Sequence, residues 1–477
     1  MSNRFFKFIL TTGILFSAGI TKAQFNISGE FRSRGEYRDG YLFLRDSSRS
    51  PNLDIIGRAR LAFDYSYEKF STRFSIQQAF TYGQNYYSSD TISKNTVNLF
   101  EAWFKYNFNG SFGLKLGRTE VVYDDERLFG ASNWSMWGAT HDILIAQWDP
   151  TDHKIKGDFG FAVNNIAPAS PFLNSYNMRN NYKYLSYLYL NKKLLKNKLN
   201  VSVLAAVDAF QKYGLTITKI KNDTQYIYNE YDSIIGYLPV ITKTTSLQEF
   251  PDILYARATV GAGLWLNLKK WSFMLNAYYQ GGHVRDGRKL NANFYAFWVG
   301  YQVVKPLKLM AGYEHLSGNN FSDTTLMKTQ VSGFSTLYGT SHRAYGYMDM
   351  FTSVVKDNMG MGLNDLFGRV TLSFSDKMSL EASCRWFSLP YAYLRVNNPK
   401  KGALPYQEVK KSLGTEMDLM YIYKPVPNLE LNAAYCFFLP TATMEAYNDL
   451  KPGTAKFAQY AYLMITYKPN FFSSAKN

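Results

Sequence analysis

Segments of alternating apolar and polar residues, joined by connections that are alternately short and long, constrain this chain's fold more than any other feature. We predict 18 strands, at residues 24–38, 55–68, 72–82, 96–108, 111–120, 140–149, 155–166, 182–192, 200–212, 254–268, 270–282, 292–304, 306–317, 364–375, 378–389, 413–424, 428–439 and 456–468. The short connections include 69–71, 109–110, 149–150, 269, 305, 376–377 and 425–427, and the long ones 39–54, 121–139, 213–253, 318–363 and 390–412. An even strand number with short periplasmic turns and long outer loops is typical of transmembrane barrels. A soluble sandwich has no reason to alternate in this way. The sequence predicts an all-β fold, a transmembrane antiparallel β-barrel.

The first predicted strand shows the alternation clearly. Phe25, Ile27 and Phe31 fall on one face, and Arg32 and Arg34 fall on the other. Successive side chains of a strand point to opposite faces, so one side is apolar and the other is charged. In a transmembrane barrel the apolar side faces lipid and the charged side faces the lumen.

The composition fits a barrel better than a soluble enzyme. Aromatic residues make up 17 % of the chain, with 38 Tyr and 35 Phe, and the mean hydropathy is −0.26. Alternating strands average to nearly neutral hydropathy, and Tyr and Phe suit the aromatic girdles at the membrane interfaces. After the N-terminal segment no apolar run approaches the roughly 18 residues that a membrane helix requires.

The N-terminus predicts export. Arg4 and Lys7 precede a mostly apolar run at residues 8–20, and Ala23 ends a plausible cleavage site. The run is too short for a helix that needs roughly 20 residues to cross a bilayer, so a retained anchor is the weaker interpretation. We expect a signal peptide at 1–23 and a single barrel domain at 24–477. Removal of this peptide takes away Arg4, Lys7 and Lys22 and no carboxylate, so the formal charge falls from +16 to +13.

The two cysteines do not suggest a disulfide framework. Cys384 and Cys436 lie in separate predicted strands with another strand between them. We interpret both as small residues packed in the barrel wall rather than as a bridge.

Four motifs, in order along the chain, carry a family resemblance. They are Gly29–Tyr37 (GEFRSRGEY); Gly117–Glu120 continuing through Asp125–Gly130 to Trp134 and Asp142; Glu314–Asn319; and Phe334–His342 ending in Gly346–Asp349. The chain resembles the alginate export family of outer-membrane porins. The resemblance implies an 18-stranded barrel whose arginine-rich pathway passes an anionic polysaccharide outward.

The chain also departs from that family. Ala139-Thr140-His141 stands where members often have a basic residue before the aspartate, here Asp142. Some members gate the periplasmic mouth with a long turn, whereas every inner connection here is short. The departures leave the transported substrate open.

Charged side chains on the inward face are the candidate substrate pathway. Alternation selects Arg32, Arg34, Arg58, Arg60, Arg73, Lys105, Lys115, Arg257, Arg369 and Arg385, with the acids Glu30 and Asp64, and the family motif contributes Arg118 and Arg127. The planar fork of guanidinium donates two parallel hydrogen bonds to a carboxylate, and basic rings are a known device of anion-selective pores. The alternative is that paired charges brace the lumen wall.

The loop residues allow two interpretations each. Asp124, Asp125 and Glu126 could bind a cation, but a solvated loop or a partner for Arg127 is the simpler reading, and we expect no metal and no cofactor. The aromatic loop residues could stack on sugar rings or hold an inward-folded loop in place; they are Trp134, Trp137, Tyr338 and Tyr347.

The sequence gives no reason to expect an enzyme. Ser341-His342 and His141-Asp142 are adjacent in sequence, whereas a nucleophile and its base are defined by placement in space. Phosphate-cradling, CxxC and HExxH signatures are absent from the sequence.

Three functions remain open at this point. They are export of an acidic polysaccharide, diffusion of small anions or general solutes, and a surface-binding barrel whose loops matter more than its pore. The expected partners are outer-membrane lipid, acidic polysaccharide or small anions, periplasmic biosynthesis or export proteins, and the barrel-assembly machinery. The aromatic-rich last strand at 456–468 resembles the signal that this machinery reads. We expect no nucleic-acid partner.

Overall fold

The computed structural model describes residues 23–83, 97–164, 181–228, 234–340, 342, 344–352, 360–395 and 406–474. The expected signal peptide lies outside the described residues, apart from Ala23. None of the helices in these ranges is long and apolar enough to span a membrane.

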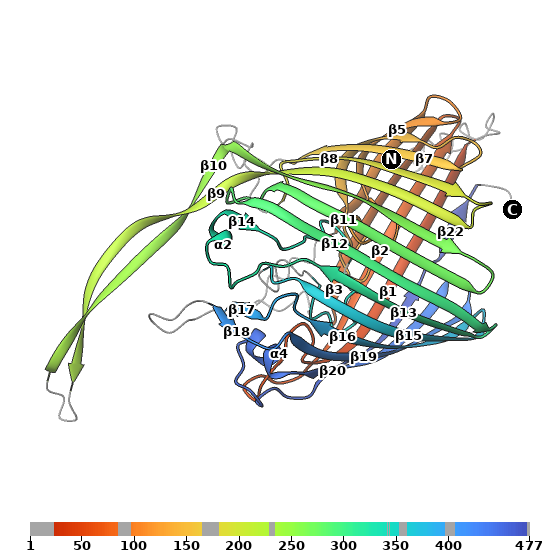
Figure 1. Cartoon of the computed structure of the whole chain (residues 1–477). Coiled ribbons are helices and arrows are strands. Elements are labelled where there is room, and N and C mark those ends of the chain that lie inside the picture. The colour runs from red at the N-terminus through yellow and green to blue at the C-terminus, as the bar shows by residue number, and fades with distance from the viewer. Residues whose placement is uncertain are drawn as a thin grey trace, which may run out of the picture.

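Eighteen antiparallel strands form a closed barrel (Figure 1). They are β1 (Gln24–Asp39), β2 (Asn52–Tyr67), β3 (Phe70–Thr81), β4 (Asn98–Asn107), β5 (Phe112–Thr119), β6 (His141–Trp148), β7 (Ile155–Val163), β8 (Tyr184–Leu194), β9 (Leu199–Tyr228), β10 (Ile234–Asn267), β11 (Trp271–His283), β12 (Lys289–Val304), β13 (Leu307–Leu316), β15 (Leu363–Ser375), β16 (Met378–Ser388), β19 (Ser412–Val426), β20 (Leu429–Pro440) and β21 (Ala458–Tyr467). Each pairs with its neighbours in the sequence, and β1 pairs with β21 to close the ring, with Phe31 opposite Tyr467. The predicted fold class is confirmed.

A few short elements accompany the barrel. β14 (Gln330–Val331) pairs in parallel with the start of β12, and β17 (Tyr393–Arg395) pairs with β18 (Tyr406–Glu408). β22 (Asn470–Ser473) continues along β1 after β21. The helices α2 (Leu326–Thr329) and α4 (Ala442–Tyr447) lie in long connections.

The connection predicted at 213–253 is the clearest difference in the fold. β9 and β10 do not end at the barrel rim but continue as a two-stranded ribbon that projects well beyond it (Figure 1). The pairing runs on with Leu215 opposite Leu247 and Tyr226 opposite Tyr237. The segment is rich in Thr, Ile and Tyr, which favour extended backbone, so the strands run well beyond their predicted bounds of 200–212 and 254–268.

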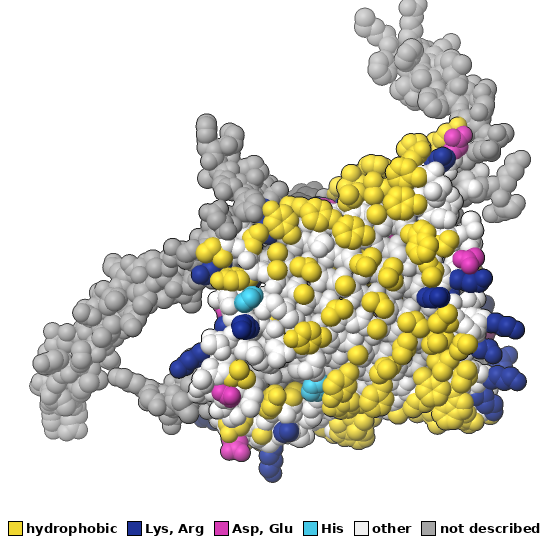
Figure 2. All heavy atoms as spheres, turned by 45° about the horizontal axis from the view of Figure 1, so that its top comes forward, with side chains coloured by type: hydrophobic (Ala, Val, Ile, Leu, Met, Phe, Trp, Pro, Cys, Tyr) yellow, Lys and Arg dark blue, Asp and Glu magenta, His cyan; other side chains and the backbone are white. Residues whose placement is uncertain are grey.

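The outer wall of the barrel is the apolar one. In β12 Phe297 is 49 % exposed while the adjacent Ala296 is fully buried, and this alternation recurs in the other strands. Figure 2 shows aromatic and aliphatic side chains spread over the wall. Apolar groups exposed all around a closed barrel are stable in contact with lipid, so this surface is the membrane-facing one.

Two long connections fold inward instead of lying over the rim. We call residues 120–140, between β5 and β6, the first inner loop, and the described residues of 317–362, between β13 and β15, the second inner loop. Phe129 of the first and Phe334, Met348 and Phe351 of the second are at most 1 % exposed. These side chains give the barrel a packed interior next to its polar lumen.

Cys384 in β16 and Cys436 in β20 are both free thiols, and β19 lies between their strands. The prediction of two unbridged wall residues is confirmed.

Candidate channel lining and constriction

The arginines of the first two strands face the lumen as the alternation predicts. Arg32, Arg34 and Arg58 are 8 %, 3 % and 0 % exposed. Glu30 forms an ion pair with Arg58 and lies 3.4 Å from Arg32. These cations are therefore inward but largely covered.

The cover is the backbone of the first inner loop. Four inward side chains each donate to a carbonyl of this loop: Arg32 to Asn133, Arg34 to Trp134 (2.9 Å), Arg58 to Ser135 (3.2 Å) and Gln77 to Trp137 (2.6 Å). A guanidinium satisfies several acceptors at fixed geometry, so these donors hold the loop against the wall. The first three arginines brace the constriction, as the alternative interpretation allowed.

The second inner loop is attached to the first. The Tyr338 amide donates to the Leu128 carbonyl at 2.9 Å, the Gly130 amide to the Tyr338 carbonyl at 3.1 Å, and the Thr340 amide to the Glu126 carbonyl at 2.8 Å. Phe129 and Tyr338 form a short β-bridge. The two loops therefore narrow the lumen as one unit.

Loop aromatics reinforce this unit. Trp134 stacks on His342, and the Arg34 guanidinium lies 3.8 Å from the centre of the Trp134 ring on β1's side of the loop. The Tyr338 hydroxyl donates to Asp208 at 2.7 Å, and Tyr347 is buried. Trp137, at 51 % exposed, is the loop aromatic that remains available for contact with a solute. His342 also contacts Asp349, while Ser341 lies outside the described residues.

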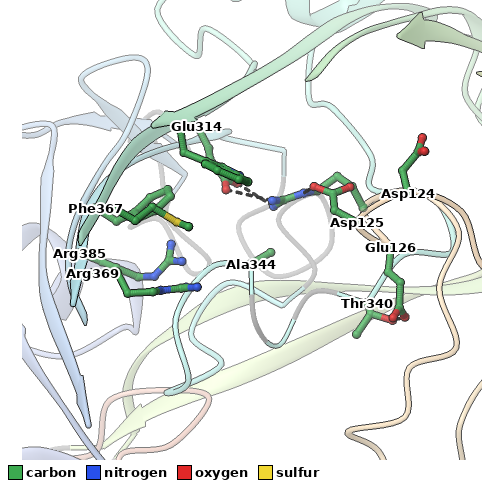
Figure 3. Close-up of a pocket in the computed structure, with 12 residues that line it drawn as sticks. Asp124, Asp125, Glu126, Glu314, Thr340, Ala344, Phe367, Arg369 and Arg385 are labelled. Carbon is green, nitrogen blue, oxygen red and sulfur yellow. Dashed lines mark hydrogen bonds and ion pairs between the residues drawn. The ribbon is translucent and has the colours of Figure 1, made fainter. Parts of the chain in front are cut away.

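A cavity of about 400 Å³ lies between the inner loops and the wall strands β13, β15 and β16. Figure 3 shows Arg369 and Arg385 reaching in from one side, with Asp125 and Glu126 across the cavity. Arg127 donates to both oxygens of Glu314, at 2.7 and 2.9 Å, in a buried bidentate pair. The cavity is lined by three cations and four carboxylates, so it has no cationic surplus.

The acidic triplet anchors the first inner loop. Asp124 accepts from Ser202 and from the Tyr189 hydroxyl, both at 2.7 Å, and Asp125 accepts from Asn276 at 3.1 Å. Burial raises the pKa of Asp124. No group of three metal-ligating side chains occurs within the described ranges.

A second cavity, of about 480 Å³, lies beside β1 and β2 and has the opposite charge balance. Its charged lining comprises four cations and two carboxylates: Arg32, Arg60, Arg73, Lys468, Glu30 and Glu120. We call it the basic cavity. Lys468 and Glu120 were not predicted, although Lys468 continues the inward alternation of β21 through Thr466.

Arg60 is the cation of the basic cavity best placed to bind a solute. Its guanidinium lies 3.5 Å from the centre of the Phe100 ring and donates to Gln77 at 2.8 and 3.2 Å. It forms no ion pair with any residue in the described part of the chain. A planar cation that is stacked and oriented, but not neutralised by a carboxylate, retains its affinity for an anion.

Most of the other predicted residues do face the lumen, but with partners. Arg73 pairs with Asp64 (3.3 Å) and Glu101 (2.9 Å), Lys115 donates to Thr119 (2.6 Å), Arg257 to Asp208 (2.9 Å), Arg369 pairs with Glu381 (3.3 Å) and Arg385 with Asp365. Lys105 lines a cavity of about 630 Å³ near the β4–β5 turn. The arginines among them line the wall as paired charges, and Lys115 has a hydroxyl as its partner.

Arg118 is the exception, and its assignment to the pathway is wrong. It lies on the outer face of β5 with the exposed Phe112 and Leu116, and it donates to both oxygens of Asp142 at 2.7 and 2.8 Å. Asp142 stands opposite Arg118 on β6 and is also exposed. The two form an ion pair on the outer wall.

Comparison with known proteins agrees with this architecture. The fold resembles the outer membrane protein OpdK of Pseudomonas aeruginosa (10 % identity, 95 % of this chain and 100 % of that one, TM-score 0.56). It also resembles OccK9 (OpdG) of Pseudomonas aeruginosa (10 %, 94 % and 98 %, 0.55) and OccAB4 of Acinetobacter baumannii (10 %, 94 % and 99 %, 0.54). At this identity the likeness concerns the fold alone. No curated protein matches the chain.

The model of one sequence family, alginate export, matches residues 23–451, nearly the whole chain. The four motifs noted in the sequence lie within that range, and the fold is that of outer-membrane porins. The chain is thus an outer-membrane β-barrel channel that belongs to the alginate export family.

Proposed function

We propose that this barrel passes an anionic solute across the outer membrane, and that its cargo is an acidic polysaccharide on its way out of the cell. The observation that carries the proposal is the basic cavity, where Arg60 is stacked on Phe100 without a carboxylate partner among the described residues. Support for a polymer rather than a small anion comes from the chain's membership of the alginate export family.

The physics of passage agrees with mixed charge along the route. A chain of carboxylates must find successive cations without binding any one of them too tightly to leave. The basic cavity provides Arg60 beside Arg73, which already shares two carboxylates, and Glu120 lies on the same lining. Such a set attracts a carboxylate while limiting its residence time.

We also propose the orientation and processing. The end with the short turns would face the periplasm: Gln24 lies there opposite Ser66, and so does β22 (Figure 1). Residues 1–23 would be removed as a signal peptide. Periplasmic synthesis or export proteins would then meet this end of the barrel.

The test is polymer block of single-channel current in a planar bilayer. An acidic oligosaccharide should interrupt the small-ion current, and a neutral oligosaccharide of equal size should do so much less. Arg60→Gln should shorten the acidic blocks by about tenfold, the loss of one charge-assisted contact worth about 1.4 kcal/mol. The matched control is the Arg118→Gln, Asp142→Asn double variant, which neutralises an outer-wall pair and should leave the blocks unchanged.

A second function, diffusion of small anions, has two observations in its favour. The inner loops narrow the lumen, and the neighbour OpdK is also recorded in a structure with vanillate, a small carboxylate. Equal block by acidic and neutral oligosaccharides, together with permeation of small carboxylates, would favour this function. A barrel that conducts nothing would favour the surface-binding role.

A further inference from the structure

Lysines surround the barrel at the end where the short turns lie. Eleven exposed lysines occupy these turns and the adjoining strand ends: Lys69, Lys154, Lys192, Lys193, Lys196, Lys198, Lys269, Lys270, Lys305, Lys377 and Lys424. We call this set the basic rim. The described carboxylates on the same turns and strand ends are five, namely Glu68, Asp149, Asp152, Asp376 and Glu430.

Few of these lysines are neutralised. Lys154 pairs with Asp152 and Lys424 with Glu430, both at 3.4 Å. The other nine form no ion pair with any residue that the structure describes. A concentration of unpaired cations at one end of the barrel creates a positive potential that attracts anions.

The basic rim lies directly beyond the apolar wall. Lys69 precedes Phe70 (54 % exposed), Lys270 precedes Trp271 (45 %), and Lys305 follows Val304 (55 %). Figure 2 shows a row of basic side chains next to a band of hydrophobic rings at this end of the barrel. Aromatic rings of this kind mark the headgroup level of a membrane, so the lysines stand at the depth of lipid phosphates.

One contact shows a rim lysine on the lipid side of the wall. The Lys270 Nζ lies 6.0 Å from the centre of the Tyr301 ring, and Tyr301 packs on Trp271 with ring centroids 4.5 Å apart. Trp271 faces outward, so this lysine extends along the outer surface and not into the mouth of the pore. A long aliphatic stem over aromatic rings with its ammonium in the headgroup zone is the expected posture at a bilayer surface.

The opposite end carries exposed lysines as well, among them Lys410, Lys411, Lys451 and Lys456. Other cations at that end form ion pairs, Arg288 with Asp286 at 2.7 Å and Arg45 with Asp39. The two ends of the barrel meet opposite faces of the membrane, so the basic rim lies at only one leaflet, that of the short-turn end.

We propose that the basic rim is a binding surface for anionic phospholipids of the leaflet at the short-turn end. The ligand chemistry is the phosphate of a lipid headgroup, bound by several turn lysines at once around the barrel. Each lysine contributes a modest attraction that salt screens. The preference for anionic lipid is therefore the sum of several weak contacts and does not depend on a single pocket. This role is independent of the solute that the pore passes.

The experiment places the folded, full-length mature barrel in nanodiscs of mixed phosphatidylglycerol and phosphatidylcholine, and measures the lipids retained by native mass spectrometry. We expect about threefold enrichment of phosphatidylglycerol at low salt, declining as salt rises. The quadruple variant Lys196→Gln, Lys269→Gln, Lys270→Gln, Lys305→Gln should bring the ratio close to that of the bulk lipid. These side chains are exposed and lack ion pairs, so folding should be retained, as heat-modifiable gel migration would show.

The matched control removes the same charge from the other end, through Lys410→Gln, Lys411→Gln, Lys451→Gln and Lys456→Gln, which are also exposed. This control variant should retain the enrichment of phosphatidylglycerol. Equal retention of both lipids by the wild type would overturn the proposal, as would loss of the preference in the control alone. A rim variant that keeps its lipid preference but loses anion current at low salt would assign the lysines to the pore mouth instead.

Discussion

Trp134 and His342 stack face to face, with ring centroids 3.7 Å apart and planes inclined by 5°. The first belongs to the loop between β5 and β6 and the second to the loop between β13 and β15. This stack, closed on its other face by Arg34, joins the two loops to the wall of β1. The width of the lumen therefore depends on the contacts between side chains far apart in the sequence.

Removing this stack should loosen the constriction. Trp134→Ala deletes a large packed side chain, at a cost of about 3 kcal/mol in unfolding free energy, and should make the open-channel current larger and noisier. Chemical denaturation of the barrel in detergent, together with single-channel recording, checks both effects. Trp137→Ala, in the same loop but with a half-exposed side chain, is the control and should change stability by less than about 1 kcal/mol. Equal effects of the two variants would contradict a bracing role for Trp134.

Breaking the buried pair of Arg127 and Glu314 should destabilise the barrel strongly. Glu314→Gln leaves the Arg127 guanidinium buried without its bidentate partner, which costs about 3–5 kcal/mol in unfolding free energy. The exposed pair of Arg288 and Asp286 is the control, since Asp286→Asn should cost less than about 1 kcal/mol. Replacing both members, as Arg127→Met with Glu314→Leu, should recover most of the loss. If the double variant recovers no unfolding free energy, the Arg127–Glu314 pair must stabilise the barrel through contacts other than the mutual neutralisation of the two charges.

The anion preference of the pore should increase as the pH falls toward the ordinary range of a glutamate. Burial, and next the nearby charge of Glu101, raise the pKa of Glu120 above its usual 4.5. Glu120 therefore gains a proton while most other carboxylates are still charged, and the basic cavity loses one of its two negative charges. Reversal potentials in a salt gradient, measured between pH 7 and pH 4.5, should show this step.

The Glu120→Gln variant provides the control for that pH dependence. It should show the higher anion preference already at pH 7, and the step should be absent. A pH profile identical to that of the wild type would exclude Glu120 as the titrating group.

An epitope tag placed after Tyr228, within the ribbon of β9 and β10, should be accessible to antibody on intact cells. The ribbon leaves the barrel at the end with the long connections, which we propose to face the medium. A tag inserted in the β8–β9 turn at Asn197 should react only after the outer membrane is permeabilised. The reverse accessibility would overturn the proposed orientation while leaving the fold intact.

Much of the fold could be predicted because it is encoded locally. The alternation of β12, such as Ala296 inward and Phe297 outward, is visible in any short window of sequence. The ribbon of β9 and β10 was missed because strand length is set by pairing with a partner strand, not by the barrel rim. The β-branched residues of the ribbon were the sequence feature that could have indicated its extended conformation.

The candidate site could be predicted only in part. Alternation placed Arg32, Arg34 and Arg58 in the lumen, but the carbonyls that they bind belong to a loop 77 to 101 positions later in the chain. Such long-range hydrogen bonds have no local pattern. The wrong assignment of Arg118 could have been avoided from the sequence. Arg118 is three residues from the inward Lys115, and residues an odd number apart on a strand lie on opposite faces.

The pairing of Phe31 with Tyr467 has a consequence for how the protein is made. These residues lie near opposite ends of the chain, so the hydrogen-bonded seam between β1 and β21 cannot form until almost the whole polypeptide has been synthesised and exported. Contacts of such sequence separation form slowly, because the entropy of closing the intervening chain opposes them. A chain truncated before β21 would leave two open strand edges and invite aggregation. Biogenesis of this protein should accordingly be all-or-none, with the nascent barrel dependent on chaperones until its last strand arrives.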